Sequence, residues 1–258
     1  MSRADMPECN AYIYYALTGK LLLITIHMFV QMGRHPLLYG RYVTNDQSLM
    51  LVPAKVGWFV MDLPSFLIPV LLLYLSGSLD STVKKLLLFL FFGHYFHRTF
   101  IYGITTKGNP VPCNIVISSI IFCAFNGYLQ GYSLIYCTHY DDDWTSEIRF
   151  ISGVLLFLMG LTINIHSDYM LLGLRKSNEY IYFIPQGGFF EYVSAANYFG
   201  EIVEWFGYAL ATCTFPAFLF AIFTAINLGF RAHQHHRYYL QKFDDYPKSR
   251  KSLIPFII

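Results

Sequence analysis

Residues 149–171 read RFISGVLLFLMGLTINIHSDYML, and most of this stretch is apolar. A helix rises 1.5 Å per residue, so a segment of this length crosses the roughly 30 Å hydrocarbon core of a bilayer. Its second half carries polar groups at Asn164, Ser167 and Asp168, and Arg175 follows. These positions are spaced i, i+3, i+4 and i+11, which places them on one helical face. The stretch therefore predicts a membrane-spanning helix with a polar stripe.

Further segments of similar length and hydropathy occur along the whole chain. Together they predict an all-α polytopic membrane protein, with seven transmembrane helices in one bundle and a single domain over residues 1–258. The expected spans are 11–32, 56–75, 86–105, 113–136, 149–171, 193–213 and 215–231, the last of which runs on into a basic, aromatic tail.

The composition supports a membrane protein. The chain has 258 residues, of which 55% are hydrophobic, 19% aromatic and only 13% charged. Charged residues make up about 25% of an average soluble domain, which argues against a water-soluble globule. The net charge of +2 is too small for a nucleic-acid-binding protein, and charge this sparse excludes a disordered chain.

The cysteines and histidines suggest no covalent or metal framework. Five cysteines are scattered without a CxxC pair, so we interpret them as small hydrophobic residues rather than a disulfide framework or a zinc site. His233, His235 and His236 lack the i, i+4 spacing of a helical metal site, so no metal is expected. The first ten residues contain acids and a proline rather than a basic leader, so the first apolar segment is expected to remain as an anchor.

Lysine and arginine counts predict the orientation. The loops 33–55, 106–112 and 172–192 and the tail from Arg231 onward carry twelve basic residues, against four on the opposite side. Because basic residues concentrate on the cytoplasmic side, we expect a cytosolic C-terminus and a lumenal N-terminus.

Two more helices carry polar stripes within or next to predicted spans. One consists of Asn197, Glu201, Glu204 and Tyr208, and the other of Arg231, His235, Tyr239 and Lys242. Three stripes that face one another would line a cleft open to the cytosol, with arginines for phosphates and carboxylates for ribose hydroxyls. A dinucleotide would suit this cleft, although no GxGxxG motif or P-loop occurs. The alternative is that these groups pair with one another and hold the bundle together.

A second polar group lies among the earlier spans. Asp62 stands alone among apolar neighbours, with Pro64 and Pro69 expected to break its helix, and Tyr95 and Arg98 share a face of the next span. A carboxyl group that stays protonated there could, together with a tyrosine hydroxyl, donate hydrogen bonds to a substrate carbonyl. The alternative is that Asp62 forms an ion pair with Arg98 and takes no part in chemistry.

These residues lie in strings that resemble the steroid 5α-reductase family, most closely its type 2 form. The similarity extends over nearly the whole chain from about residue 39 and is densest after residue 94. The strings are HYFHRTF (94–100), FNGYLQGY (125–132), INIHSDY (163–169), IPQGG (184–188), AANYFGEIVEWFGYALAT (195–212), FRAHQHHRYYL (230–240) and DYPKSRKSLIPF (245–256).

The resemblance implies a multi-pass enzyme of the endoplasmic reticulum (microsomal) membrane that uses NADPH to reduce the Δ4 double bond of 3-oxo-Δ4-steroids, such as testosterone and progesterone. Helices within 11–136 would surround the substrate, and 149–258 would bind NADPH. The implied partners are steroid and lipid bilayer, with no nucleic acid and no obligate protein partner. Asp62 and Tyr95 would bind the steroid carbonyl, and Trp58, Phe122 and Phe223 would wall in the steroid. The implied cofactor contacts are Tyr39, Asn164, Asp168, Arg175, Tyr182, Asn197, Glu201, Arg231, His235 and Tyr239.

The chain departs from the family pattern at several positions. Met61-Asp62 replaces Gln-Glu, and an aspartate is one methylene shorter, by roughly 1.4 Å, enough to misplace a catalytic group. Phe183 stands where a basic residue is usual, and Ser118 and Asn227 replace an arginine and a phenylalanine. These departures leave two alternatives open: reduction of another enone or enoyl lipid, or a catalytically weakened sterol-binding relative.

Overall fold

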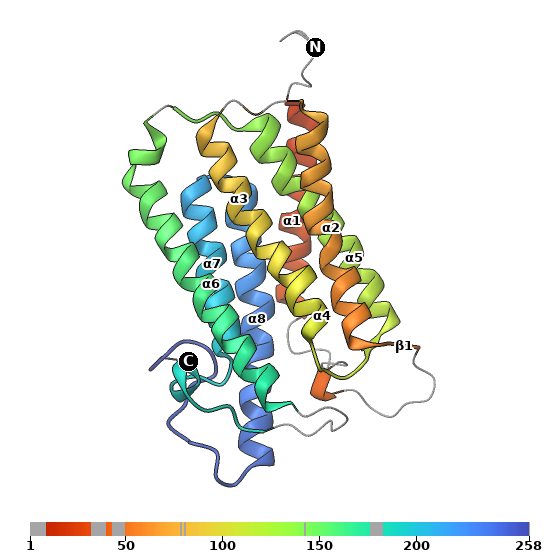
Figure 1. Ribbon diagram of the computed structural model, residues 1–258, viewed down its shortest axis with the longest axis vertical. Helices are drawn as coiled ribbons and strands as arrows, with labels where there is room; N and C mark the ends of the chain where they lie inside the picture. The colour runs from red at the N-terminus through yellow and green to blue at the C-terminus, as the bar shows by residue number, and fades with distance from the viewer. Residues whose placement is uncertain are drawn as a thin grey trace.

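Long helices packed side by side make up most of the protein (Figure 1). The computed structural model describes residues 9–31, 40–42, 50–77, 79, 81–141, 143–175 and 183–257. Within these ranges the long helices are α1 (Ala11–Gln31), α2 (Ala54–Leu75), α3 (Thr82–Phe96), α5 (Cys113–Tyr132), α6 (Ile148–Leu174), α7 (Ala196–Thr212) and α8 (Phe215–Lys242). The short elements are η2 (Gly40–Tyr42), η3 (His97–Tyr102), α4 (Gly103–Thr105), η4 (Ser133–Cys137), η5 (Trp144–Ser146), η6 (Gly188–Glu191), β1 (Leu51–Val52) and β2 (Val111–Pro112).

Five of the described helices are long and apolar enough to cross a membrane: α1, α2, α5 with its extension η4, α6 and α8. The other two long helices are shorter. Helix α7 has 17 residues, and α3 has 15 before the chain continues as η3 and α4. Large apolar side chains point away from the bundle, including Phe89 (72% exposed), Ile121 (64%) and Leu155 (62%). An apolar outer surface of this kind requires a lipid environment.

The expectation that Pro64 and Pro69 break α2 was wrong, because the helix runs without interruption from Ala54 to Leu75. Prolines are tolerated in membrane helices when neighbouring elements pack against the weakened turn. Gly127 and Gly131 of α5 allow this packing, since a Cβ at Gly131 would lie 3.0 Å from Pro69. The antiparallel pair of β1 and β2, in which Val52 faces Val111, joins the same two helices at one end of the bundle.

Glycines allow α6 and α7 to approach each other closely. Gly153 and Gly160 on α6 face Gly200 and Gly207 on α7, seven residues apart on each helix. A Cβ at any of the four would collide with the backbone of the opposite helix. Small residues at this spacing are typical of tightly packed membrane helices. The close approach brings the polar stripes of the two helices into direct contact.

Two of the described segments have π-helical geometry. The stretches η3 and η4 are π-helical and continue α3 and α5 without a break. Such segments are rare and occur frequently at functional sites, because each wider turn changes the direction of the side chains that follow. The segment η3 contains Arg98 and Tyr102, and η4 ends at Cys137.

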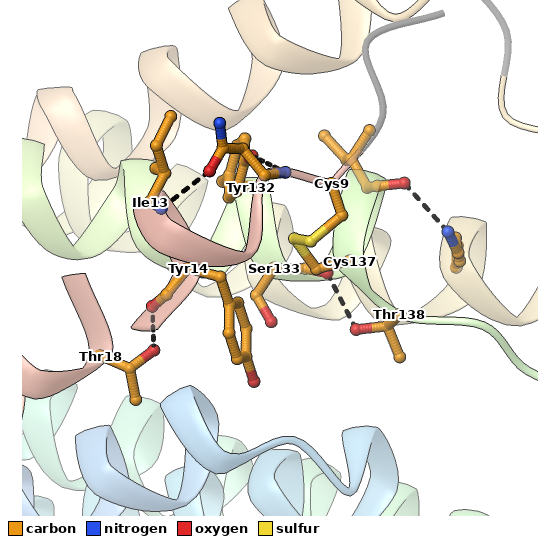
Figure 2. The surroundings of a disulfide bond; sticks show 11 residues. Cys9, Ile13, Tyr14, Thr18, Tyr132, Ser133, Cys137 and Thr138 are labelled. Atoms are coloured by element: carbon orange, nitrogen blue, oxygen red, sulfur yellow. Dashed lines mark hydrogen bonds between the residues drawn. A yellow bond between two sulfur atoms is a disulfide. The ribbon is translucent and has the colours of Figure 1, made fainter. Parts of the chain in front are cut away.

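Cys9 and Cys137 form a disulfide, which corrects the interpretation of all five cysteines as small hydrophobic residues (Figure 2). The bond joins the segment before α1 to the end of η4, 128 residues apart in sequence. Next to it, the Asn10 amide donates a hydrogen bond to the Tyr132 hydroxyl at 2.8 Å. Spacing along the chain could not reveal this pair, because only helix packing brings the two ends together. The start of α1, next to Cys9, lies at the end of the bundle opposite the C-terminus (Figure 1).

Candidate active site

A cavity of about 520 Å³ lies within the bundle and is lined by residues of all seven long helices, to which α6 contributes Leu171. Its size is that of a typical ligand pocket. Eleven of the residues expected at a substrate or cofactor site line this cavity: Trp58, Asp62, Tyr95, Phe122, Arg175, Asn197, Glu201, Phe223, Arg231, His235 and Tyr239.

Aromatic rings form the wall at the more apolar end. Phe122 of α5 and Phe223 of α8 stack with ring centres 4.3 Å apart and planes 21° apart. Tyr95 is 6% exposed and packs against Trp205 and Phe91, with ring centres 5.8 and 4.8 Å away. These contacts hold the tyrosine ring from behind, so that the side chain has little freedom to turn away from the cavity.

Arg98 links the two acidic groups of this region. It donates a hydrogen bond of 3.2 Å to Asp168, and its Nε lies 3.8 Å from Asp62 Oδ2. The rings of Trp58 and Tyr102 lie 5.4 and 4.6 Å from the guanidinium. Among the described residues, Asp62 Oδ2 has no hydrogen-bond partner. The proposed ion pair between Asp62 and Arg98 is therefore present, but long, and within the described residues the buried carboxyl oxygen accepts no hydrogen bond.

Charged and hydrogen-bonding groups occupy the other end of the cavity. Arg175, Glu201 and Arg231 line it together with the His235 ring. Both nitrogens of that ring are engaged, with the Tyr42 hydroxyl 2.9 Å from Nδ1 and the Tyr198 hydroxyl 3.2 Å from Nε2. The Tyr42 and His235 rings are parallel within 2°. An arginine-rich, aromatic-lined end of this kind matches the groups needed to bind a dinucleotide.

Asn164 and Asp168 do not line the cavity and form a second layer behind it. Asn164 donates to the Asn197 carbonyl at 2.9 Å, and Asn197 donates from its side chain to Asp168 at 2.9 Å. Asn164 and Asp168 therefore follow the alternative given above, in which polar groups of neighbouring helices bind one another and hold the bundle together. Of the remaining expected cofactor contacts, Tyr39 and Tyr182 lie outside the described residues.

The chain after α8 folds back and supports the loop that precedes α7. Val193 pairs with Lys251 in a parallel bridge, and Arg250 donates to the Pro185 carbonyl at 2.7 Å. Ser194 Oγ lies 2.6 Å from the Tyr246 hydroxyl, and burial raises the pKa of Tyr246, so this hydroxyl stays protonated at neutral pH. Ser194 and its neighbours line the cavity, so the C-terminal segment supports one wall of the site.

Some cavity residues were missed by sequence reasoning. Tyr42 and Tyr198 were not singled out, although both contact His235. His94 also lines the cavity, and its Nδ1 lies 2.7 Å from Glu204 Oε1. The sequence did contain a signal for the His94–Glu204 pair. Both residues are ionisable and lie inside predicted spans, where each such group suggests a function.

Comparison with known proteins identifies the family of the chain. Residues 109–258 match the family model described as 3-oxo-5-alpha-steroid 4-dehydrogenase. The chain is 49% identical over 243 residues to 3-oxo-5-alpha-steroid 4-dehydrogenase 2 of Rattus norvegicus and of Homo sapiens, covering 93% of this chain and 96% of each relative. It is 47% identical over 224 residues to 3-oxo-5-alpha-steroid 4-dehydrogenase 1 of Homo sapiens, covering 85% of this chain and 86% of that relative. The resemblance found in the sequence is thus confirmed, and the chain belongs to the 3-oxo-5-alpha-steroid 4-dehydrogenase family, the steroid 5α-reductases.

Proposed function

We propose that this protein reduces the Δ4 double bond of 3-oxo-Δ4-steroids, such as testosterone and progesterone, with NADPH as hydride donor. The observation that carries the proposal is that Asp62 and Tyr95 share one cavity with the stacked Phe122 and Phe223 rings. A flat, apolar molecule with one carbonyl oxygen fits this combination of apolar walls and two hydrogen-bonding groups.

The polar end of the cavity fits NADPH by its chemistry. Arg175 and Arg231 provide charge for phosphates, Glu201 can accept from ribose hydroxyls, and Asn197 can bind an amide. The Tyr42 and His235 rings offer flat surfaces beside these groups. When bound, NADPH supplies the hydride that is transferred to the substrate.

Asp62 and Tyr95 would act on the steroid 3-carbonyl. As the double bond gains a hydride at C5, negative charge develops on that oxygen as an enolate. A protonated Asp62 and the Tyr95 hydroxyl would donate hydrogen bonds to it, and they would stabilise the enolate more than the neutral ketone. Asp62 and Asp168 share one guanidinium, that of Arg98, so retention of a proton on Asp62 balances the charge in this low-dielectric region. Protonation at C4 completes the reaction.

The fold supports a location in the membrane of the endoplasmic reticulum. We infer seven spans, with α3 and α7 crossing the bilayer as the shorter members, a lumenal N-terminus and a cytosolic C-terminus. Disulfides form in the oxidising lumen and are rare in the cytosol, and Cys9–Cys137 lies at the end that the lysine and arginine counts place in the lumen. The chain would act as a single domain without an obligate protein partner, in contact with steroid and lipid.

Microsomes from cells that express the chain test the proposal. They should convert a 3-oxo-Δ4-steroid to its 5α-dihydro product only when NADPH is supplied. Failure to form product from any of a panel of such steroids would overturn it. The same panel should include an enoyl lipid, since reduction of that substrate alone would identify a different enone reductase.

The short Asp62 side chain supports a second candidate, a catalytically weakened sterol-binding protein. Its carboxylate already contacts Arg98, at 3.8 Å, and reaches less far than a glutamate would. Tight steroid binding without NADPH oxidation, with turnover restored in Asp62→Glu, would support this candidate.

A further inference from the structure

His94 and Glu204 form a buried pair that binding of substrate or cofactor does not explain. The His94 Nδ1 and the Glu204 Oε1 are 2.7 Å apart, and the two residues are 2% and 0% exposed. In the described part of the chain, Glu204 Oε2 has no hydrogen-bond partner. Burying an ionisable group is costly, especially inside a membrane, so a pair with an unsatisfied oxygen suggests a function beyond packing.

The pair connects the cavity with the bundle interior. His94 lines the cavity, whereas Glu204 lies behind it on α7. His94 packs against the Tyr95 and Trp205 rings, with ring centres 4.9 and 4.7 Å away. The other charged groups that act on it are Glu201, Arg98 and Asp62. Because Nδ1 contacts Glu204, Nε2 is the ring nitrogen that remains to exchange a proton with a group in the cavity.

The proposed reaction consumes one proton per turnover, and this requirement gives the pair a role. Hydride adds at C5, the electron pair of the C4–C5 double bond moves toward the carbonyl oxygen, and the nicotinamide is oxidised. The resulting enolate forms a C4–H bond with a proton, and the carbonyl is restored. If that proton comes from the donor pair Asp62 and Tyr95, it must be replaced before the next turnover, inside an apolar bundle.

We propose that His94 and Glu204 store and return this proton. The inference rests on the proposed function. The imidazolium form of His94, stabilised by the Glu204 carboxylate, gives up an N–H proton, and an O–H bond re-forms on the donor pair. One proton from bulk solvent, carried through water at the cytosolic end of the cavity, then re-forms the imidazolium of His94. A general acid and base of this kind contributes about 100-fold or more to a rate, and histidine is the side chain most often used.

The variant Glu204→Gln tests the role with little change in shape, because glutamine keeps an oxygen that accepts from His94 but cannot hold a negative charge. Turnover should fall about tenfold to 100-fold, while the steroid dissociation constant stays within about twofold. Because proton return becomes slow, the isotope effect from deuterated NADPH should shrink toward one, and the isotope effect from D2O should rise.

A second variant controls for folding and for the underlying activity. Thr212 is buried on the same helix, outside the cavity, and within the described chain its hydroxyl bonds only to backbone carbonyls and to Thr214, so Thr212→Val should leave both isotope effects unchanged. Turnover of Glu204→Gln within twofold of the unmodified protein would overturn the inference. So would a slower enzyme with unchanged isotope effects, since this would indicate a structural role. Absence of steroid reduction by the unmodified protein would instead refute the proposed function.

Discussion

Arg98 donates a hydrogen bond of 3.2 Å to Asp168, and this contact joins η3 to α6 directly behind Asp62. The same aspartate accepts from the Asn197 side chain, so three helical elements meet at one carboxylate. Both partners are largely buried, with side-chain exposures of 13% and 2%. The position of Arg98, and with it the environment of Asp62, therefore depends on a residue that does not line the cavity.

Asp168→Asn should destabilise the protein and weaken catalysis. The change leaves a buried guanidinium with a weaker partner, and loss of one member of such a pair costs about 3 to 5 kcal/mol. We expect a lower unfolding temperature in detergent and a higher KM for NADPH, because the single amide oxygen of asparagine would have to accept from both Arg98 and Asn197. The exposed pair Arg149–Glu147 is a matched control, and Glu147→Gln should change stability by about 1 kcal/mol or less. Equal stability of the two variants would contradict this account of the Asp168 contacts.

Tyr95→Phe should lower kcat/KM about 100-fold or more, because it removes one donor to the developing enolate. Steroid binding should change much less, since the ring still packs against Trp205 and Phe91. Steady-state assays combined with equilibrium binding separate the two effects. A similar loss in binding affinity and in kcat/KM would indicate that the hydroxyl binds the ground state and not the transition state.

Gly160→Leu should prevent proper packing of α6 against α7. Any side chain at this position would collide with the α7 backbone at Glu204 and Gly200. Over-packing in a core typically costs about 1 to 3 kcal/mol, and a backbone clash costs more. We expect loss of the folded monomer in size-exclusion chromatography. Gly173 has open space around its Cα, so Gly173→Ala serves as the control and should be neutral or slightly stabilising.

Cys9→Ser should lower the unfolding temperature and leave turnover close to that of the unmodified protein. A disulfide that closes a long loop stabilises a protein by about 2 to 4 kcal/mol, and this one links residues 128 positions apart, far from the cavity. Cys137→Ser should have the same effect, whereas Cys213→Ser should have none, because Cys213 is a free thiol. Thermal unfolding with and without reductant checks these outcomes. A reductant-insensitive unfolding temperature in the unmodified protein would argue against a stabilising bond.

Arg250→Gln should raise the KM for NADPH several-fold with a smaller effect on the steroid. Arg250 is 3% exposed and holds the loop before α7 through the Pro185 carbonyl and Glu191. That loop continues into Ser194 and Asn197, which line the polar end of the cavity. Varying NADPH at saturating steroid measures the KM for NADPH, and varying steroid at saturating NADPH measures the KM for the steroid. An unchanged KM for NADPH would show that the C-terminal segment does not support the cofactor end.

Helix positions were the part of the fold that sequence reasoning predicted well. The predicted spans 11–32, 113–136 and 149–171 agree with α1, α5 with η4, and α6 to within about four residues at each end. Local composition is enough here, because a membrane segment must be apolar over a set length and must satisfy its own backbone hydrogen bonds. The prediction failed at Pro64 and Pro69, where the helix continues and packs closely against Gly127 and Gly131 of α5.

Periodicity also predicted which residues would share a face, but not the direction of that face. Asn197, Glu201 and Glu204 occupy one stripe, yet the first two line the cavity and the third turns toward His94 on another helix. Asp168 likewise lies behind the cavity and not in its wall. A stripe covers a wide angle of a helix, so the exact rotation decides which members reach a ligand.

The sequence by itself determined the membrane environment, the length of the spans and the family, because hydropathy and long shared strings are local properties of the chain. Only the tertiary structure decided that Cys9 meets Cys137, that Arg98 lies between Asp62 and Asp168, and that His94 pairs with Glu204. Each of these contacts joins segments at least 36 residues apart and depends on how closely and at what rotation the helices pack. The glycines on α6 and α7 allow the two helices to approach closely, and the spacing of residues along the sequence does not reveal this distance.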